Sequence, residues 1–250
     1  MIKLTIETQK LLHRLERIRL KGIPYAVAMA MTWTAKAAAE AFGKVLERDL
    51  DRPTAFTLRA SPYKPANKEK TEFDVYIQDE ASKGVPPAKY LLALVKGGYR
   101  RNKGTENLLR RAGILPGGWQ VQPGADAQLD GYGNLQGGGG RYTAILSALK
   151  AHRETGYTMN RTAASSKRNA KTQRDYFVLF SLKTKTPTGV YTRSGRGGRD
   201  IKQILAFTPK RAKYRKTLDF AGTIGKAFRE TFDRNLREGL RRMLEKVKSW

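Results

Sequence analysis

A segment of thirty residues near the C-terminus carries the periodicity that most restricts how this chain can fold. From Leu218 to Val247, apolar side chains recur at spacings of three and four, which places them on one face of an α-helix. Arginine and lysine occupy the opposite face, so the rest of the chain must cover the apolar one. The apolar positions are Ile224, Phe228, Phe232, Leu236, Leu240, Met243 and Val247.

The N-terminal third also predicts helices. Glu7–Leu20 is amphipathic, Gly22 is a suitable residue to end that helix, and Pro24 is a suitable residue to open another that runs to about Asp49. The many alanines of the second helix indicate that a neighbouring helix or sheet approaches it closely. Its expected apolar ridge is Val27, Ala30 or Met31, Thr34, Ala37 or Ala38, Ala41 and Val45.

Five segments have the alternation or β-rich composition of strands. Ala55–Leu58 and Phe73–Ile77 precede the middle of the chain, and Tyr176–Leu182, Gly189–Arg193 and Ile201–Phe207 follow it. The last three are neighbours in sequence, so we expect them to pair antiparallel.

The middle of the chain predicts short helices and a long loop. The helices are expected at Ala88–Lys96, Thr105–Ala112 and Arg141–Arg153. Gly113–Gly140 is rich in glycine and contains two prolines, which favours a loop that is either functional or mobile.

Together these elements predict an α+β fold, in which long N- and C-terminal helices pack on an antiparallel β-sheet with a loop-rich insertion. The expectation is a single domain over residues 1–250, with 83–160 as a candidate inserted lobe of loops and short helices. The chain lacks cysteine, which excludes disulfides, thiol nucleophiles and cysteine-based metal sites. No apolar run reaches the length of a membrane span, so no membrane partner is expected.

The charge is extreme for a chain with an ordinary hydrophobic content of 40%. Lysine and arginine total 49 against 22 acidic residues, a formal net charge of +27. Such an excess predicts an anionic partner, which is either a nucleic acid or an acidic protein surface. Between Arg161 and Lys216 there are 16 basic residues and only two acids. The candidate contacts are Lys167, Arg168, Lys171 and Arg174, and a second cluster of Lys210, Arg211, Lys213, Arg215 and Lys216 around Tyr214.

The sequence offers only weak candidates for catalytic residues. Asp74, Asp79 and Glu80 with Lys83 have the residue types of a magnesium-dependent nuclease, although such short spacings arise by chance in a charged chain. The two histidines, His13 and His152, have no metal-ligand spacing around them and read as surface or helix-end residues.

Two further patterns resemble ligand loops without completing them. Gly137–Gly140 lacks the lysine and hydroxyl of a phosphate-binding loop, and a flexible loop is the simpler interpretation. Asp126 and Asp130 lack the alternating aspartates and the distal glutamate of a calcium loop. We therefore expect no cofactor, no metal and no small-molecule substrate.

A series of short strings runs in a fixed order from about Asp51 to Phe220. It includes Pro53–Thr57, Tyr90–Leu92, Leu109–Pro116, Leu129–Asn134, Ile145–Leu149, Tyr176–Val178 and Gly189–Tyr191. In this shared order the chain resembles phage and prophage virion proteins of the head–tail morphogenesis region. More distantly the chain is similar to tail-completion and neck proteins, whose paired-helix opening its first fifty residues resemble.

The resemblance implies a non-enzymatic structural subunit of a tailed-phage neck or tail. Such a subunit is expected to form a homo-oligomeric ring that joins head or portal and tail components, with packaged DNA as a further contact. It implies location in the virion after assembly in the host cytoplasm. The alternative that the basic residues leave open is a nucleic-acid-binding protein that acts on phage DNA.

Overall fold

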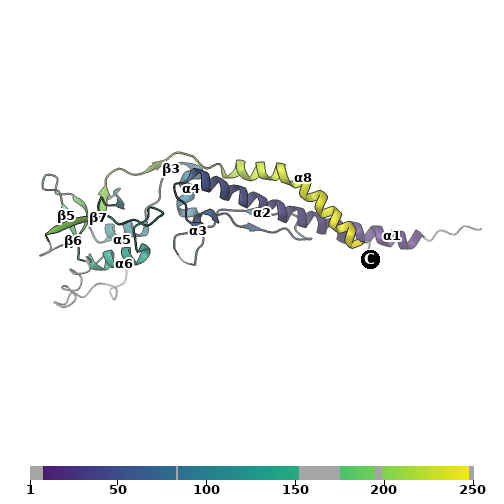
Figure 1. Ribbon diagram of the computed structural model, residues 1–250, viewed down its shortest axis with the longest axis horizontal. Helices are drawn as coiled ribbons and strands as arrows, with labels where there is room; N and C mark the ends of the chain where they lie inside the picture. The colour runs from purple at the N-terminus through teal and green to yellow at the C-terminus, as the bar shows by residue number, and fades with distance from the viewer. Residues whose placement is uncertain (1–7, 83, 152–174, 195–198, 248–250) are drawn as a thin grey trace, which may run out of the picture. The chain divides into compact units, whose positions relative to one another are not determined.

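The computed structural model describes residues 8–82, 84–151, 175–194 and 199–247 (Figure 1). The chain forms two compact units, one of Met1–Ala88 with Thr217–Trp250 and one of Lys89–Lys216. The α+β class is confirmed. Whereas the sequence predicted a single domain with a candidate lobe at 83–160, the second unit continues to Lys216.

The first unit is built on two long helices, α2 (Ile23–Asp49) and α8 (Phe220–Val247), which lie side by side (Figure 1). Gly22 meets Met243 at one end, and the rings of Phe42 and Phe220 meet edge to face, 4.9 Å apart, at the other. The helices are therefore antiparallel, and α8 confirms the predicted C-terminal helix. None of the described helices is both long and apolar enough to cross a membrane.

Small residues let α2 and α8 approach closely, as the alanines of α2 predicted. A Cβ added to Gly239 of α8 would stand 2.6 Å from the carbonyl oxygen of Ala26. Thr34 is fully buried, and its hydroxyl accepts a hydrogen bond from the Asn235 amide (3.0 Å). The fully buried side chains of α2 are Ala26, Ala30, Thr34, Ala35, Ala38, Phe42 and Leu46, so Ala26, Phe42 and Leu46 replace the expected Val27, Ala41 and Val45.

The prediction that Gly22 ends the first helix is wrong. Helix α1 (Thr8–Arg17) continues through a π-helical turn, Ile18–Gly22, directly into α2. In this turn the Ile23 N–H bonds to the Ile18 carbonyl, five residues back. Pro24 has no N–H and cannot donate the hydrogen bond of an ordinary α-helical turn. The wider π-helical turn before it accommodates this missing bond, so the helix continues.

The predicted strand at Ala55–Leu58 is a short helix, α3, with the same bounds. Its first turn is capped, because the Thr57 N–H donates to the Thr54 hydroxyl (3.2 Å). The second predicted strand is present but shorter: β2 (Asp74–Val75) pairs antiparallel with β1 (Tyr63–Lys64). Both strands contact α2, which therefore packs against them as well as against α8.

The second unit contains a four-stranded antiparallel sheet in the order β4-β7-β6-β5. Strands β5 (Tyr176–Phe180), β6 (Pro187–Ser194) and β7 (Asp200–Thr208) confirm the three predicted strands and their pairing. Strand β4 (Gln120–Pro123) lies inside the predicted loop, Gly113–Gly140. These four residues are too few for their alternation to predict a strand, and pairing with β7 makes them one.

Helices α4 (Ala88–Lys96) and α5 (Gly104–Arg111) confirm their predictions. Helix α6 (Gly138–Ala148) begins inside the glycine run and ends before the predicted Arg153, since Lys150 adopts a positive φ of 55°. Side chains from α5, α6 and the sheet share one core, which includes Leu109, Ile145, Val190 and Leu205.

Candidate functional site

Two segments that are far apart in the sequence form a small ribbon in the second unit. Strand β3 (Gly98–Tyr99) pairs antiparallel with β8 (Lys213–Tyr214), with Gly98 opposite Tyr214 and Tyr99 opposite Lys213. The Arg100 N–H extends this pairing by donating to the Ala212 carbonyl (3.2 Å). We call residues 96–103 and 210–216 the basic ribbon.

The basic ribbon concentrates positive charge. It contains nine lysines and arginines and no acidic residue. The five cations of 210–216, which the sequence predicted as one cluster, are all exposed. The pairing adds four that sequence reasoning missed, because nothing in the local pattern connects the two segments. The nine are Lys96, Arg100, Arg101, Lys103, Lys210, Arg211, Lys213, Arg215 and Lys216.

An exposed tyrosine organises the outward side of the ribbon. Tyr99 is 55% exposed, and its ring lies 5.0 Å from the Arg211 guanidinium carbon and 5.8 Å from Lys213 Nζ. Both distances are within the range of cation–π attraction. Since alternate residues of a strand share a face, the two cations and the ring lie on the same side of the ribbon.

The ribbon is attached to the core of its unit through β8. The Ala212 N–H donates to the side-chain oxygen of Gln120 (3.0 Å), a β4 residue that is only 1% exposed. The backbone of the ribbon is therefore tied to the edge of the four-stranded sheet.

A buried ion pair attaches the ribbon through β3. Glu106 of α5 has no exposed surface, and its carboxylate accepts two hydrogen bonds from the Arg100 guanidinium (2.5 and 3.0 Å). It also accepts from the backbone N–H groups of Lys103 (2.8 Å) and Val121 (2.9 Å). Burial alone would raise the pKa of Glu106, but the hydrogen bonds from Arg100, Val121 and Lys103 outweigh it and lower the pKa. Glu106 is thus a carboxylate that joins β3, α5 and β4.

Sequence reasoning did not single out Glu106. Its place three residues into a helix suggests a capping role, since a glutamate there often accepts from the N-cap backbone. Its complete burial and its pairing with Arg100 depend on the tertiary structure.

Several other candidates lie outside the described residues. These are the first basic cluster, Lys167, Arg168, Lys171 and Arg174, together with Lys83 and His152. His13 is described and is an exposed residue of α1.

The structure does not assemble a metal site from the remaining candidates. Asp74, Asp79 and Glu80 are exposed, and the described part of the chain brings no three acidic or histidine side chains together as metal ligands. Asp126 accepts from the Gln203 N–H (2.8 Å), and Asp130 accepts from the backbone of its own loop. Both aspartates therefore stabilise loops.

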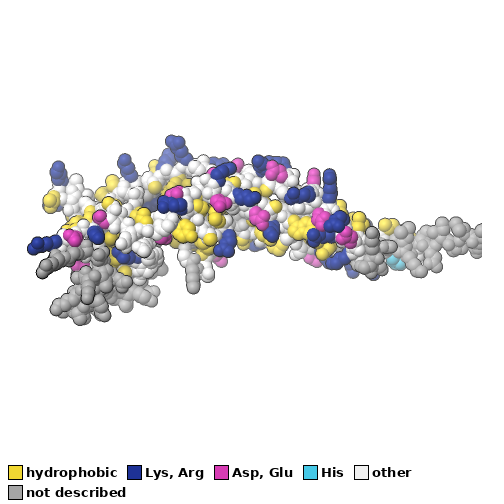
Figure 2. Space-filling view, in the orientation of Figure 1, with side chains coloured by type: hydrophobic (Ala, Val, Ile, Leu, Met, Phe, Trp, Pro, Cys, Tyr) yellow, Lys and Arg dark blue, Asp and Glu magenta, His cyan; other side chains and the backbone are white. Residues whose placement is uncertain are grey.

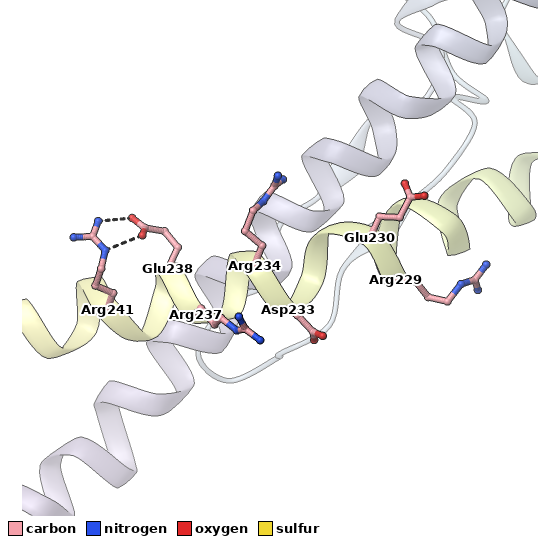
Figure 3. Close-up of a pocket in the computed structure, with 7 residues that line it drawn as sticks. All are labelled: Arg229, Glu230, Asp233, Arg234, Arg237, Glu238 and Arg241. Atoms are coloured by element: carbon pink, nitrogen blue, oxygen red, sulfur yellow. Dashed lines mark hydrogen bonds and ion pairs between the residues drawn. The ribbon is translucent and has the colours of Figure 1, made fainter.

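A hollow on the surface of α8 is lined by that helix alone (Figure 3). Some of its charges are paired along the helix: Arg241 reaches Glu238 (2.8 Å) and Glu245 (2.7 Å). Hydrogen bonds from Arg241 and Arg242 lower the pKa of Glu238 to about 2. Acidic and basic side chains are interspersed over the visible face of the helical pair (Figure 2). Such pairs support an exposed helix and do not by themselves form a binding site.

Comparison of the chain with protein-family models, with curated proteins and with solved structures finds no match.

Proposed function

We propose that this chain is a structural subunit of a tailed-bacteriophage neck or tail. In this role it binds copies of itself and adjacent virion proteins, and forms a ring between the head or portal and the tail. The sequence resemblance over Asp51–Phe220 suggests the class of protein, and an exposed apolar helix face supports the mode of action.

The supporting face lies on α1 and the π-helical turn that follows it. Leu12 is 61% exposed, Leu15 is 53% exposed and Leu20 is 59% exposed. Single exposed leucines are ordinary, but a row of them on one short helical stretch is typical of a surface that another protein covers. An amphipathic helix of this kind is a common docking element between subunits.

A second exposed apolar group favours the same interpretation. Phe180 is exposed at the end of β5, and Leu182 is exposed two residues beyond it. Among the described strands, β5 is one of the two edge strands of the four-stranded sheet. An outer strand offers backbone N–H and C=O groups to a strand of a neighbouring subunit. Helix docking and strand pairing are both means by which identical subunits close a ring.

The proposal is tested in the phage itself. Mass spectrometry of purified particles should detect the chain at a copy number typical of a ring, and deletion of its gene should stop production of infectious particles. Particles that lack the chain, or a deletion phage that infects normally, would contradict the proposal.

Complementation with variants tests the α1 face. Leu12→Glu with Leu15→Glu should prevent incorporation into particles, because carboxylates cannot be buried in an apolar contact without a large cost. Gln9→Glu with His13→Glu adds the same two carboxylates to polar positions of the same helix and should be tolerated. Equal incorporation of both variants would show that this face is not a contact.

A further inference from the structure

We propose that the basic ribbon binds the phosphate backbone of duplex DNA independently of base sequence. This activity goes beyond the structural role proposed above and does not depend on it. The inference rests on the charge of the ribbon, on the arrangement around Tyr99 and on the rigid attachment of both strands.

The charge is uncompensated on the exposed side. The ribbon carries nine cations and no acid of its own. The carboxylate attached to it, Glu106, is buried and bonded to Arg100, so it does not neutralise the outward residues. Neutralising phosphates with such cations releases condensed counterions, which is the main source of sequence-independent affinity.

The composition favours nucleic acid over an acidic protein surface. Protein interfaces have an apolar centre that is depleted of charge. The ribbon has no such centre, because Ala212 is only half-buried and the remaining residues are cationic, glycine, asparagine or tyrosine. A charged strip with tyrosines suits phosphate contacts, in which lysine, arginine and tyrosine side chains all donate hydrogen bonds.

The environment of Tyr99 favours phosphates over unpaired bases. Arg211 and Lys213 both lie over the Tyr99 ring, where a stacked base would otherwise sit. The ring therefore holds the two cations in position and is not a free stacking platform of the kind that single-strand binders use. Duplex DNA, whose bases are already stacked, is the ligand that this arrangement fits.

The ribbon is ordered before any ligand arrives. Gln120 holds its backbone at Ala212, and the buried pair of Arg100 with Glu106 holds the other strand. Binding therefore requires little further ordering of the ribbon backbone. Only the flexible lysine and arginine side chains have to adapt to the phosphates.

The test uses the purified full-length chain and fluorescence anisotropy with labelled 30-bp DNA duplexes of two unrelated sequences over a series of NaCl concentrations. The wild type should bind both duplexes equally, with a steep linear fall of log K against log salt. The ribbon variant Lys210→Gln, Arg211→Gln, Lys213→Gln should reduce that slope by roughly 0.9 for each phosphate that it no longer neutralises. The control Arg229→Gln, Arg234→Gln, Arg237→Gln removes the same charge from the exposed side of α8 and should leave the slope close to wild type.

Further arms identify the ligand. Tyr99→Leu should weaken binding to duplex, because the ring no longer positions Arg211 and Lys213, while circular dichroism confirms that the variant folds. An equal loss of affinity in the ribbon and α8 variants would show that only net charge matters and would overturn the proposal. Tighter binding of single-stranded oligonucleotide, or competition by poly-glutamate as effective as that by duplex, would also overturn it. Each of these failures leaves the neck or tail proposal standing, since that proposal is decided by particle composition.

Discussion

At the scale of single residues, the buried Glu106 connects segments of the second unit that lie apart in the sequence. Its carboxylate accepts four hydrogen bonds, from Arg100, Lys103 and Val121, and so joins the basic ribbon to a helix and to the edge of the sheet. A buried ion pair adds little net stability when it is complete, but removal of one partner leaves the other charge uncompensated.

We expect Glu106→Gln to destabilise the chain by about 3–5 kcal/mol, because it leaves Arg100, whose side chain is only 14% exposed, without its counter-charge. Urea denaturation followed by circular dichroism measures the decrease in unfolding free energy. Glu230→Gln, which removes an exposed carboxylate from α8, is the matched control and should change little. Equal effects of the two substitutions would show that the hydrogen bonds of Glu106 do not hold these segments together.

The stability that Glu106 provides should depend on pH in a definite direction. Its pKa is lowered in the folded chain, so its contribution is fully present above the unfolded value of about 4.3 and is lost as the pH falls through the folded value. The difference in unfolding free energy between wild type and Glu106→Gln should therefore shrink as the pH is lowered from about 5, which lies above the unfolded value of about 4.3, to strongly acidic pH. Urea denaturation at several pH values measures this difference, and a constant difference would contradict the assigned ionisation.

At the scale of elements, close approach decides how α2 and α8 pack. The carbonyl oxygen of Ala26 occupies the space where a side chain at Gly239 would begin. Backbone cannot move aside as a flexible side chain can, so this contact depends on glycine.

Gly239→Ala should therefore cost about 1–3 kcal/mol, as overpacking does elsewhere, although alanine is the better helix former. Gly225→Ala in the same helix is the control, since its nearest neighbour is the flexible end of Arg229 at 3.6 Å. Thermal unfolding should show a lower midpoint for Gly239→Ala and an unchanged or higher midpoint for Gly225→Ala. A stabilised Gly239→Ala variant would mean that the helices are farther apart than described.

At the scale of the whole molecule, the chain consists of two units with separate cores. One core lies between α2 and α8, and the other lies among α5, α6 and the four-stranded sheet. A substitution in one unit should first affect the protection of that unit.

Hydrogen exchange can follow both units in one sample. Glu106→Gln should speed exchange in peptides that contain Val121, whose N–H bonds to the carboxylate, and leave α2 and α8 close to wild type. Gly239→Ala should speed exchange in α2 and α8 and leave peptides that contain Val121 close to wild type. Uniform acceleration across both units by either variant would show that they unfold as one.

The sequence by itself determined the elements whose signal is local. The long C-terminal helix follows from the spacing of Ile224 to Val247, and the three central strands follow from their apolar β-rich runs. The exposed cations of 210–216 follow from composition alone. Periodicity and charge act over a few residues, so they can be read without knowledge of the fold.

Only the tertiary structure decided the rest. Pairing with β7 turns Gln120–Pro123 from loop into strand. The pairing of Tyr99 with Lys213 and the burial of Glu106 create the candidate site. These outcomes depend on which segments meet across long stretches of intervening chain, and no local pattern encodes that. The strand predicted at Ala55–Leu58 failed for a local reason instead, because the Thr54 hydroxyl caps a helix there.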